Sequence, residues 1–189
     1  MESTPFDEKY WISRAKENRE DFAPIYDHYV KRIYRYFSFR VGKTLAEDLT
    51  QQTFLKAMSR LDSFREESLF STWLFQIAKY TLMDEQRKQK RRPRECELDS
   101  LSANSSACYA ENATTQLDLT SALQQINETE REIIMLRFLG ECTFAEIAQI
   151  MQMGESAVKN RLYRALEKVK GNLRGSEDSY EAQFRRDCF

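Results

Sequence analysis

The stretch TFAEIAQIMQMGESAVKNRLYRALEK, residues 143–168, decides the predicted fold of the C-terminal part of the chain. It opens with a capping box, because the Thr143 hydroxyl and the Glu146 carboxylate can each bind a free amide at a helix start. Gly154 then permits a tight turn before a second helix, whose apolar residues are spaced four, three and four apart on one face. These residues are Val158, Leu162, Ala165 and Val169. The pattern is typical of a helix-turn-helix.

The opposite face of the second helix is polar and cationic. Amide and cationic donors on an exposed helix suit the base edges of the DNA major groove, and cations on its flanks suit the phosphates. A helical bundle with an ordinary solvated face is the alternative, since helix-turn-helix shapes also occur in proteins that bind only protein. The residues expected off the buried face are Ser156, Lys159, Asn160, Tyr163 and Arg164, and the candidate phosphate contacts are Arg161 and Lys168.

An apolar stripe at helical spacing also runs through the N-terminal part of the chain. Gly42 is predicted to end the helix that carries this stripe, and Thr44–Glu47 to form a capping box at the next helix. The polar residues 62–70 are predicted to form a loop, after which Ser71 or Thr72 caps another helix. The stripe consists of Phe22, Ile25, Tyr26, Tyr29, Ile33 and Phe37.

The last predicted helix of this part joins aromatic side chains to a basic end. Aromatic faces can stack on unpaired bases while cations hold the backbone, so the combination suits a DNA strand that is being opened. The alternative is an aromatic core with a solvated basic end, and Trp73 is predicted to belong to the core. The aromatic residues are Trp73, Phe75 and Tyr80, and the basic end comprises Arg87, Lys88, Lys90, Arg91 and Arg92.

Low glycine and proline contents favour helices over sheets. The 189 residues include 5 Gly and 3 Pro, whereas β-rich folds need more turn residues. Residues 93–116 are rich in Ser, Ala and Asn, which predicts a flexible linker. We therefore expect an all-α chain with two small helical domains, residues 1–92 and 117–175, and a C-terminal tail, residues 176–189.

Composition disfavours several functional classes. A net charge of −1 for the whole chain gives no indication of nucleic-acid binding. Such binding would have to come from a local cluster of cations, as in the basic stretch at residues 88–94. The 4 cysteines form no C-x-x-C pair and His28 is the only histidine, so we expect free thiols and no metal site or cofactor. We find no Gly-rich phosphate loop or nucleophile–base pair, so no enzyme is expected. The N-terminus lacks a signal-peptide core and no apolar run reaches membrane-spanning length, which predicts a cytoplasmic protein.

Three motifs resemble conserved regions of the sigma-70 family of RNA polymerase sigma factors. AEDLTQQTFLKA, residues 46–57, resembles region 2.2, and FSTWLFQIAKYTLMDEQRK, residues 70–88, is similar to regions 2.3 and 2.4. Residues 126–170 look like region 4. The motifs occur in the family's order, and regions 1.1 and 3 of larger sigma factors are not found. The chain therefore looks like a member of the extracytoplasmic-function (ECF) group.

The resemblance implies that core RNA polymerase, through its β′ clamp and β flap, and promoter DNA are partners. The loop at residues 62–70 would hold a base flipped out of the −10 element, and the helix-turn-helix would read the −35 element. An anti-sigma factor is implied as well, with membrane contact only through that protein. The implied residues are Asp48, Gln51 and Phe54 for polymerase, Phe64, Tyr80, Asp84, Arg87, Lys88 and Arg91 for the −10 strand, and Ser156, Lys159, Asn160, Arg161, Arg164 and Lys168 for the −35 element.

Some positions depart from the family pattern. Tyr80 stands where Asn is common, so stacking is expected there in place of an amide hydrogen bond. Gln152 and Ala157 stand where Gly and Thr are common, which predicts a differently capped turn and the loss of one phosphate-binding hydroxyl. Two other functions stay open on the sequence: a helix-turn-helix regulator that acts without core polymerase, and a helical protein-interaction adaptor.

Overall fold

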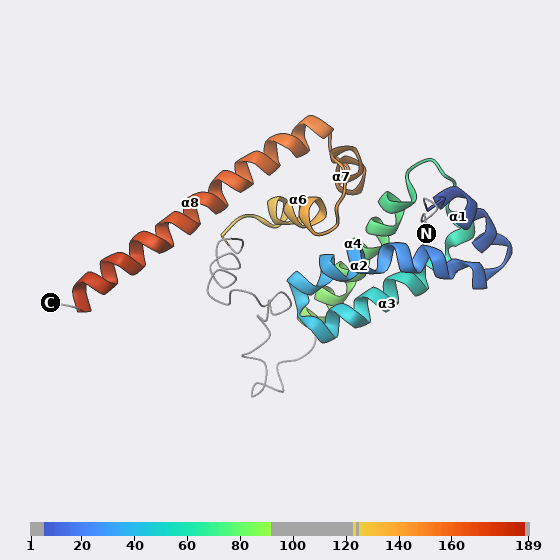
Figure 1. Cartoon of the computed structure of the whole chain (residues 1–189), viewed down its shortest axis with the longest axis horizontal. Coiled ribbons are helices and arrows are strands. Elements are labelled where there is room, and N and C mark those ends of the chain that lie inside the picture. The colour runs from blue at the N-terminus through green and yellow to red at the C-terminus, as the bar shows by residue number, and fades with distance from the viewer. Residues whose placement is uncertain (1–5, 92–122, 124, 188–189) are drawn as a thin grey trace, which may run out of the picture.

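The computed structural model describes residues 6–91, 123 and 125–187, with the side chains described as far as residue 171. Within these residues every regular element is a helix (Figure 1), so the prediction of an all-α chain is confirmed. The segment predicted to be a linker, residues 93–116, lies outside the described residues.

The helices of the N-terminal part lie side by side (Figure 1). Their core is rich in aromatic side chains. The helices are α1 (Glu8–Glu17), η1 (Arg19–Phe22), α2 (Ala23–Val41), α3 (Lys43–Ser59), η2 (Leu61–Ser63) and α4 (Phe70–Arg91). α3 packs against both α2 and α4, and α1 packs against α2 and the short helices η1 and η2. The predicted apolar stripe is buried except at Tyr26, which is exposed.

The helix boundaries near α3 and α4 differ from those predicted. Gly42 ends α2 as predicted, with a φ of 78° that an L side chain adopts only with strain. The capping box predicted at Thr44–Glu47 is wrong: the Gly42 carbonyl already accepts the Ala46 amide, so α3 begins at Lys43 with no side-chain cap. Ser71 and Thr72 are not caps either, because α4 begins at Phe70 and buries both residues in its first turn.

The C-terminal part consists of α6 (Glu128–Phe138), α7 (Phe144–Met151) and α8 (Glu155–Asp187). The capping box predicted at Thr143 and Glu146 is confirmed, and Asn127 caps α6 in the same way. Gln152 ends α7 in the left-handed conformation, with a φ of 54°. The residues predicted to face inward on α8 are all buried. The helix continues to Asp187, through the segment predicted to be a tail.

The N-terminal and C-terminal parts lie against each other (Figure 1). α7 packs on α4. The turn after α6 also approaches α4 closely, since a Cβ atom on Gly140 would lie 2.9 Å from Phe75 Cε1. The lack of a side chain at Gly140 therefore permits this contact.

Candidate nucleic-acid interface

The exposed face of α8 presents the residues predicted to read duplex DNA. At 3.6 residues per turn, Ser156, Asn160 and Arg164 lie within an arc of about 80° opposite the buried stripe. All three are exposed. Lys159 and Arg161 each lie about 60° beyond one end of this arc. The helix therefore carries a central hydrogen-bonding strip with a cation on each side.

Two of the predicted cations on α8 already have acidic partners. Lys159 Nζ lies 2.7 Å from Glu155 Oε1. Lys168 Nζ lies 2.8 Å from Glu130 Oε1, a carboxylate that is almost buried at the start of α6. Among the described residues, Arg164 makes no ion pair, so its guanidinium is the free cation at the centre of the face.

The second half of α4 presents the residues predicted to bind an opened strand. They fall within an arc of about 100° at 3.6 residues per turn, and all of them are exposed, Tyr80 by 56%. A polar hollow of about 340 Å³ lies between this face and α3. The predicted residues are Tyr80, Asp84, Arg87, Lys88 and Arg91.

Lys56 is a residue of this site that sequence reasoning missed, because it reaches the α4 face from α3. It lines the polar hollow, and its Nζ donates a hydrogen bond of 3.1 Å to Thr81 Oγ1. The same atom lies 3.9 Å from Asp84 Oδ2, and Arg87 Nη1 lies 3.4 Å from Asp84 Oδ1. Asp84 therefore holds two cations beside the hollow.

Phe64 was predicted to contact a flipped base, but the structure places it in the core. It is 4% exposed and packs edge-on to Phe70 with ring centroids 5.4 Å apart. Its ring centroid also lies 5.3 Å from that of Trp73, which is partly buried as predicted. The exposed apolar side chain of this loop is Leu69.

The loop is braced from outside by α1 and η1, which were not predicted from the sequence. Lys16 Nζ donates a hydrogen bond of 2.9 Å to the Phe64 carbonyl. Arg19 Nη2 lies 2.5 Å from Asp62 Oδ2. Because both anchors precede Phe64 in the chain by more than forty residues, only the tertiary structure brings them to the loop.

The face predicted to bind polymerase lies on α3. Asp48 and Gln51 are exposed there, whereas Phe54 is 4% exposed and packs edge-on to Phe22 and Tyr26. An apolar groove of about 390 Å³ runs beside them between α3 and the start of α2. Leu55 lines the groove and is 61% exposed. Sequence reasoning missed Leu55, although a large apolar residue off the buried stripe was the available signal.

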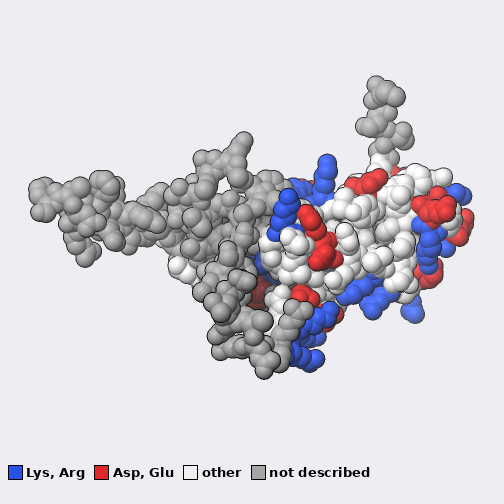
Figure 2. Space-filling model, turned by 90° about the horizontal axis from the view of Figure 1, so that it is seen from below, with Lys and Arg blue, Asp and Glu red and all other residues white. Residues whose placement is uncertain are grey.

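The charge of the described surface is divided into small groups. On the face shown in Figure 2, cationic side chains occur in several clusters separated by acidic and uncharged residues. This agrees with the net charge of −1, which hides local basic faces. In the part of the chain that the structure describes, no group of acidic, histidine and cysteine residues could hold a metal ion. No described helix is both long enough and apolar enough to cross a membrane.

Cys142 is a free thiol, as predicted, and it is fully buried. Burial, followed by the charge of Glu146, raises the pKa of this thiol to about 12. The thiol therefore stays protonated and unreactive at neutral pH. The other three cysteines lie outside the described side chains.

Comparison with known proteins places this chain, with its two helical parts, in a family. Residues 25–92 match the family model for Sigma-70 region 2. Residues 116–169 match the model for Sigma-70, region 4. Almost all of α2, together with α3 and α4, lies in the first of these regions. The second region contains α6, α7 and the first half of α8.

Two curated relatives are named as ECF sigma factors. SigW of Bacillus subtilis is 30% identical over 180 residues, which cover 86% of this chain and 95% of SigW. BldN of Streptomyces coelicolor is 33% identical over 162 residues, covering 82% of this chain, which spans 61% of the length of BldN. The chain belongs to the ECF group of the sigma-70 family.

A solved structure supports the fold. The sigma factor RpoE of Bartonella quintana, in complex with the anti-sigma factor NepR, superposes with a TM-score of 0.62. The match covers 84% of this chain and 98% of RpoE, at 24% sequence identity. At this identity the likeness concerns the arrangement of the helices alone.

Proposed function

We propose that this chain directs core RNA polymerase to promoters by binding polymerase through α3, the −10 strand through α4 and the −35 duplex through α8. The observation that carries the proposal is the pair of exposed cationic faces on α4 and α8, each within a region that matches the sigma-70 family. Two contacts on one chain gain affinity through effective concentration. The chain is proposed to act by binding alone, with no reaction of its own.

The −35 contact centres on Arg164 and Asn160. Arginine pairs in a bidentate way with guanine and asparagine with adenine in the major groove, so the two side chains can discriminate bases. Lys159 and Arg161 flank them and suit the phosphates on either side. Lys168 contributes less, because a phosphate must compete with Glu130 for its ammonium group.

The −10 contact uses stacking and backbone charge. The exposed Tyr80 ring offers a face to an unpaired base, and Arg87, Lys88 and Lys56 surround the polar hollow where a phosphate of the strand fits. Because Phe64 is buried, base capture by the loop falls to its exposed residues.

The polymerase contact uses Asp48, Gln51 and the apolar groove beside Leu55. A partly apolar groove with charged residues at its rim is typical of protein interfaces. We further propose an anti-sigma partner, because the solved relative RpoE is held by one. Phe54 is almost buried and contributes as part of the wall of this groove.

Paired substitutions test this division of labour. Arg164→Ala should weaken binding of a −35 duplex by about 1–3 kcal/mol and leave core-polymerase binding unchanged. Asp48→Ala should weaken polymerase binding and leave the duplex contact unchanged. Lys31→Ala is the matched control, since Lys31 is an exposed cation on α2 outside both faces. Equal loss of polymerase binding in both variants would show that the faces are not separate.

A further inference from the structure

The polar hollow between α3 and α4 is a concentrated site of positive charge. Four cations and one carboxylate line it, so the formal charge of its lining is +3 at neutral pH. A hollow of this charge suits an anionic group, and the anion that a DNA strand offers is the backbone phosphodiester. The charged lining residues are Lys56, Asp84, Arg87, Lys88 and Arg91, and the uncharged ones are Gln52 and Thr81.

Lys56 is a cation of this hollow whose position is fixed by the fold. Its Nζ donates a hydrogen bond of 3.1 Å to Oγ1 of Thr81, which is buried. An ammonium group has three N–H donors, so the bond to Thr81 leaves donors for a ligand. The Lys56 side chain is 36% exposed, whereas that of Lys88 is 65% exposed. Since an ordered side chain loses less conformational entropy on binding, Lys56 is better preorganised for an anion than Lys88.

The Asp84 carboxylate lies between two of the cations. Its Oδ2 is 3.9 Å from Lys56 Nζ, and its Oδ1 is 3.4 Å from Arg87 Nη1. The two cations come from different helices, α3 and α4, and like charges repel each other unless an opposite charge lies between them. Asp84 therefore holds Lys56 and Arg87 beside each other in the hollow.

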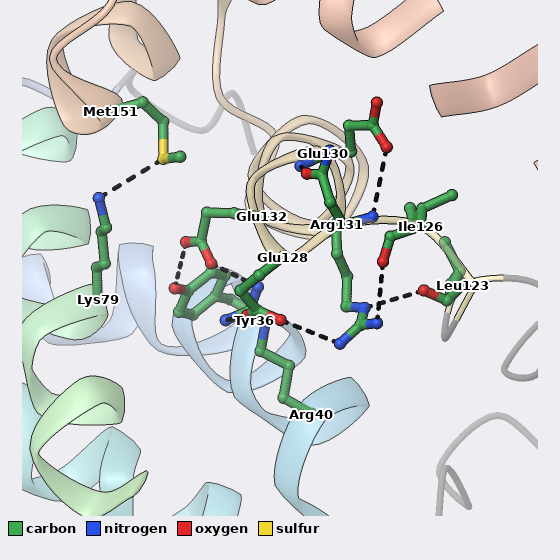
Figure 3. A network of polar contacts seen from close by, with 11 residues as sticks. Tyr36, Arg40, Lys79, Leu123, Ile126, Glu128, Glu130, Arg131, Glu132 and Met151 are labelled. Atoms are coloured by element: carbon green, nitrogen blue, oxygen red, sulfur yellow. Dashed lines mark hydrogen bonds and ion pairs between the residues drawn. The ribbon is translucent and has the colours of Figure 1, made fainter. Parts of the chain in front are cut away.

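Exposure distinguishes Asp84 from a carboxylate that only stabilises the fold. The ion pair between Arg40 and Glu132 (Figure 3) joins α2 to α6, and both of its side chains are almost buried. The Asp84 side chain is 51% exposed. Water screens an exposed ion pair, so its contribution to stability is small. The ion pairs of Asp84 therefore add little to stability but leave both cations within reach of a ligand.

We propose that Asp84 is a positioning residue, which holds Lys56 and Arg87 in the hollow for one backbone phosphate of the −10 strand and does not touch the strand itself. The resemblance to the sigma-70 family implied a direct contact, but a carboxylate repels a phosphate unless cations lie between them. Thr81 belongs to the site through its hydrogen bond with Lys56. The inference rests on the proposed function, since it concerns the strand that α4 is proposed to bind.

Three roles of Asp84 predict different effects of Asp84→Asn on strand binding. If the carboxylate only repels the strand, its neutralisation should tighten binding. If it accepts a hydrogen bond from a base, the loss of affinity should depend on that base. If it positions cations for a phosphate, the loss should be the same for every base sequence, because phosphate contacts carry no sequence information.

The first test neutralises one phosphate at a time. The complex of this chain with core polymerase is titrated with a short single strand selected from a random-sequence pool, in which one phosphate is replaced by an uncharged methylphosphonate. At one position the replacement should weaken binding by about tenfold, as expected for a hydrogen bond to a charged group. Lys56→Met should weaken binding of the unmodified strand by a similar factor and should remove the sensitivity at that position.

Lys43→Met is the matched control for the loss of a cation. Lys43 is exposed on α3 and does not line the hollow, so this variant should keep the sensitivity of the wild type at every position. Binding of core polymerase should be unchanged in both variants. If Lys56→Met retained the wild-type sensitivity at every phosphate, the phosphate site at Lys56 would be overturned.

The second test addresses the positioning role. Asp84→Asn should weaken strand binding by about threefold, within the range of an exposed ion pair, and equally for strands of different base sequence. Most of this effect should disappear when Lys56 is already methionine, because residues that act through each other are not additive. Asp27→Asn, which removes an exposed carboxylate from α2, should leave binding unchanged. Tighter binding by Asp84→Asn, or a loss confined to one base, overturns the positioning role.

The two tests separate this inference from the proposed function. If the wild-type complex with polymerase selects no single strand from the pool, the proposed −10 contact is wrong and the phosphate site falls with it. If the wild type binds its selected strand and both Lys56→Met and Asp84→Asn bind it equally well, the −10 contact stands and the phosphate site alone is wrong.

Discussion

The N-terminal and C-terminal parts of this chain stabilise their helices in different ways. α2 and α3 have no side-chain cap and depend on a large core, in which Tyr36, Phe37, Phe70 and Phe75 are almost inaccessible to water. α6 and α7 are shorter, each begins with a complete capping box, and their core is mostly aliphatic. Short helices are costly to nucleate, so satisfied amides at their first turn matter more where less apolar surface is buried.

A core truncation should have the largest effect and test the N-terminal side of this comparison. Phe37 is fully buried, so Phe37→Ala should lower the free energy of unfolding by about 3–5 kcal/mol through lost burial and the cavity left behind. Denaturant unfolding measures this value. Tyr10→Ala removes an exposed aromatic ring from α1 and should change it by less than about 0.5 kcal/mol. Similar losses in the two variants would mean that the aromatic core is not what stabilises this part.

A pair of cap substitutions should have an intermediate effect and sharpen the comparison. Thr143→Ala removes the hydroxyl that accepts the Glu146 amide, so it should cost about 1 kcal/mol of stability. Thr44→Ala removes an exposed hydroxyl that caps nothing and should cost less than about 0.5 kcal/mol. Equal losses measured by thermal or denaturant unfolding would remove the distinction between a capped and an uncapped helix start.

Acidification should have the smallest effect, and it acts where the two parts meet. Burial alone raises the pKa of Glu146, but hydrogen bonds from Ser71 and Thr143 outweigh it and hold the pKa below the usual 4.5. A folded-state pKa below the unfolded one means that the carboxylate stabilises the fold above about pH 4.5 and that this contribution is lost as the pH falls further.

Glu146→Gln should flatten this part of the pH profile. The contribution expected is about 1 kcal/mol or less, the net worth of a single hydrogen bond. Denaturant midpoints measured between about pH 3 and pH 6 should converge for the wild type and the variant at the acidic end. A constant difference across this range would contradict the titration of Glu146.

The sequence alone determined what depends on neighbours along the chain. Apolar residues at helical spacing identified the helices and the inward face of α8. The pair Thr143 and Glu146 identified the start of α7, because a capping box involves groups only three residues apart. The outward face of α8 followed from the same periodicity, whereas the residues of the α4 face were implied by the resemblance to the sigma-70 family. The capping box predicted at Thr44 does not form, although its local sequence pattern is the same. The reason is that α3 begins one residue earlier, at Lys43, with Gly42 as its N-cap residue.

Only the tertiary structure decided what depends on residues far apart in the chain. Whether Phe54 and Phe64 face water or the core is set by rings from other helices, and periodicity cannot register those contacts. The addition of Lys56 to the α4 face and the brace of Lys16 on the loop arise in the same way. The docking of α6 and α7 on α2 and α4 requires complementary charges separated by about a hundred residues, which no local pattern can pair.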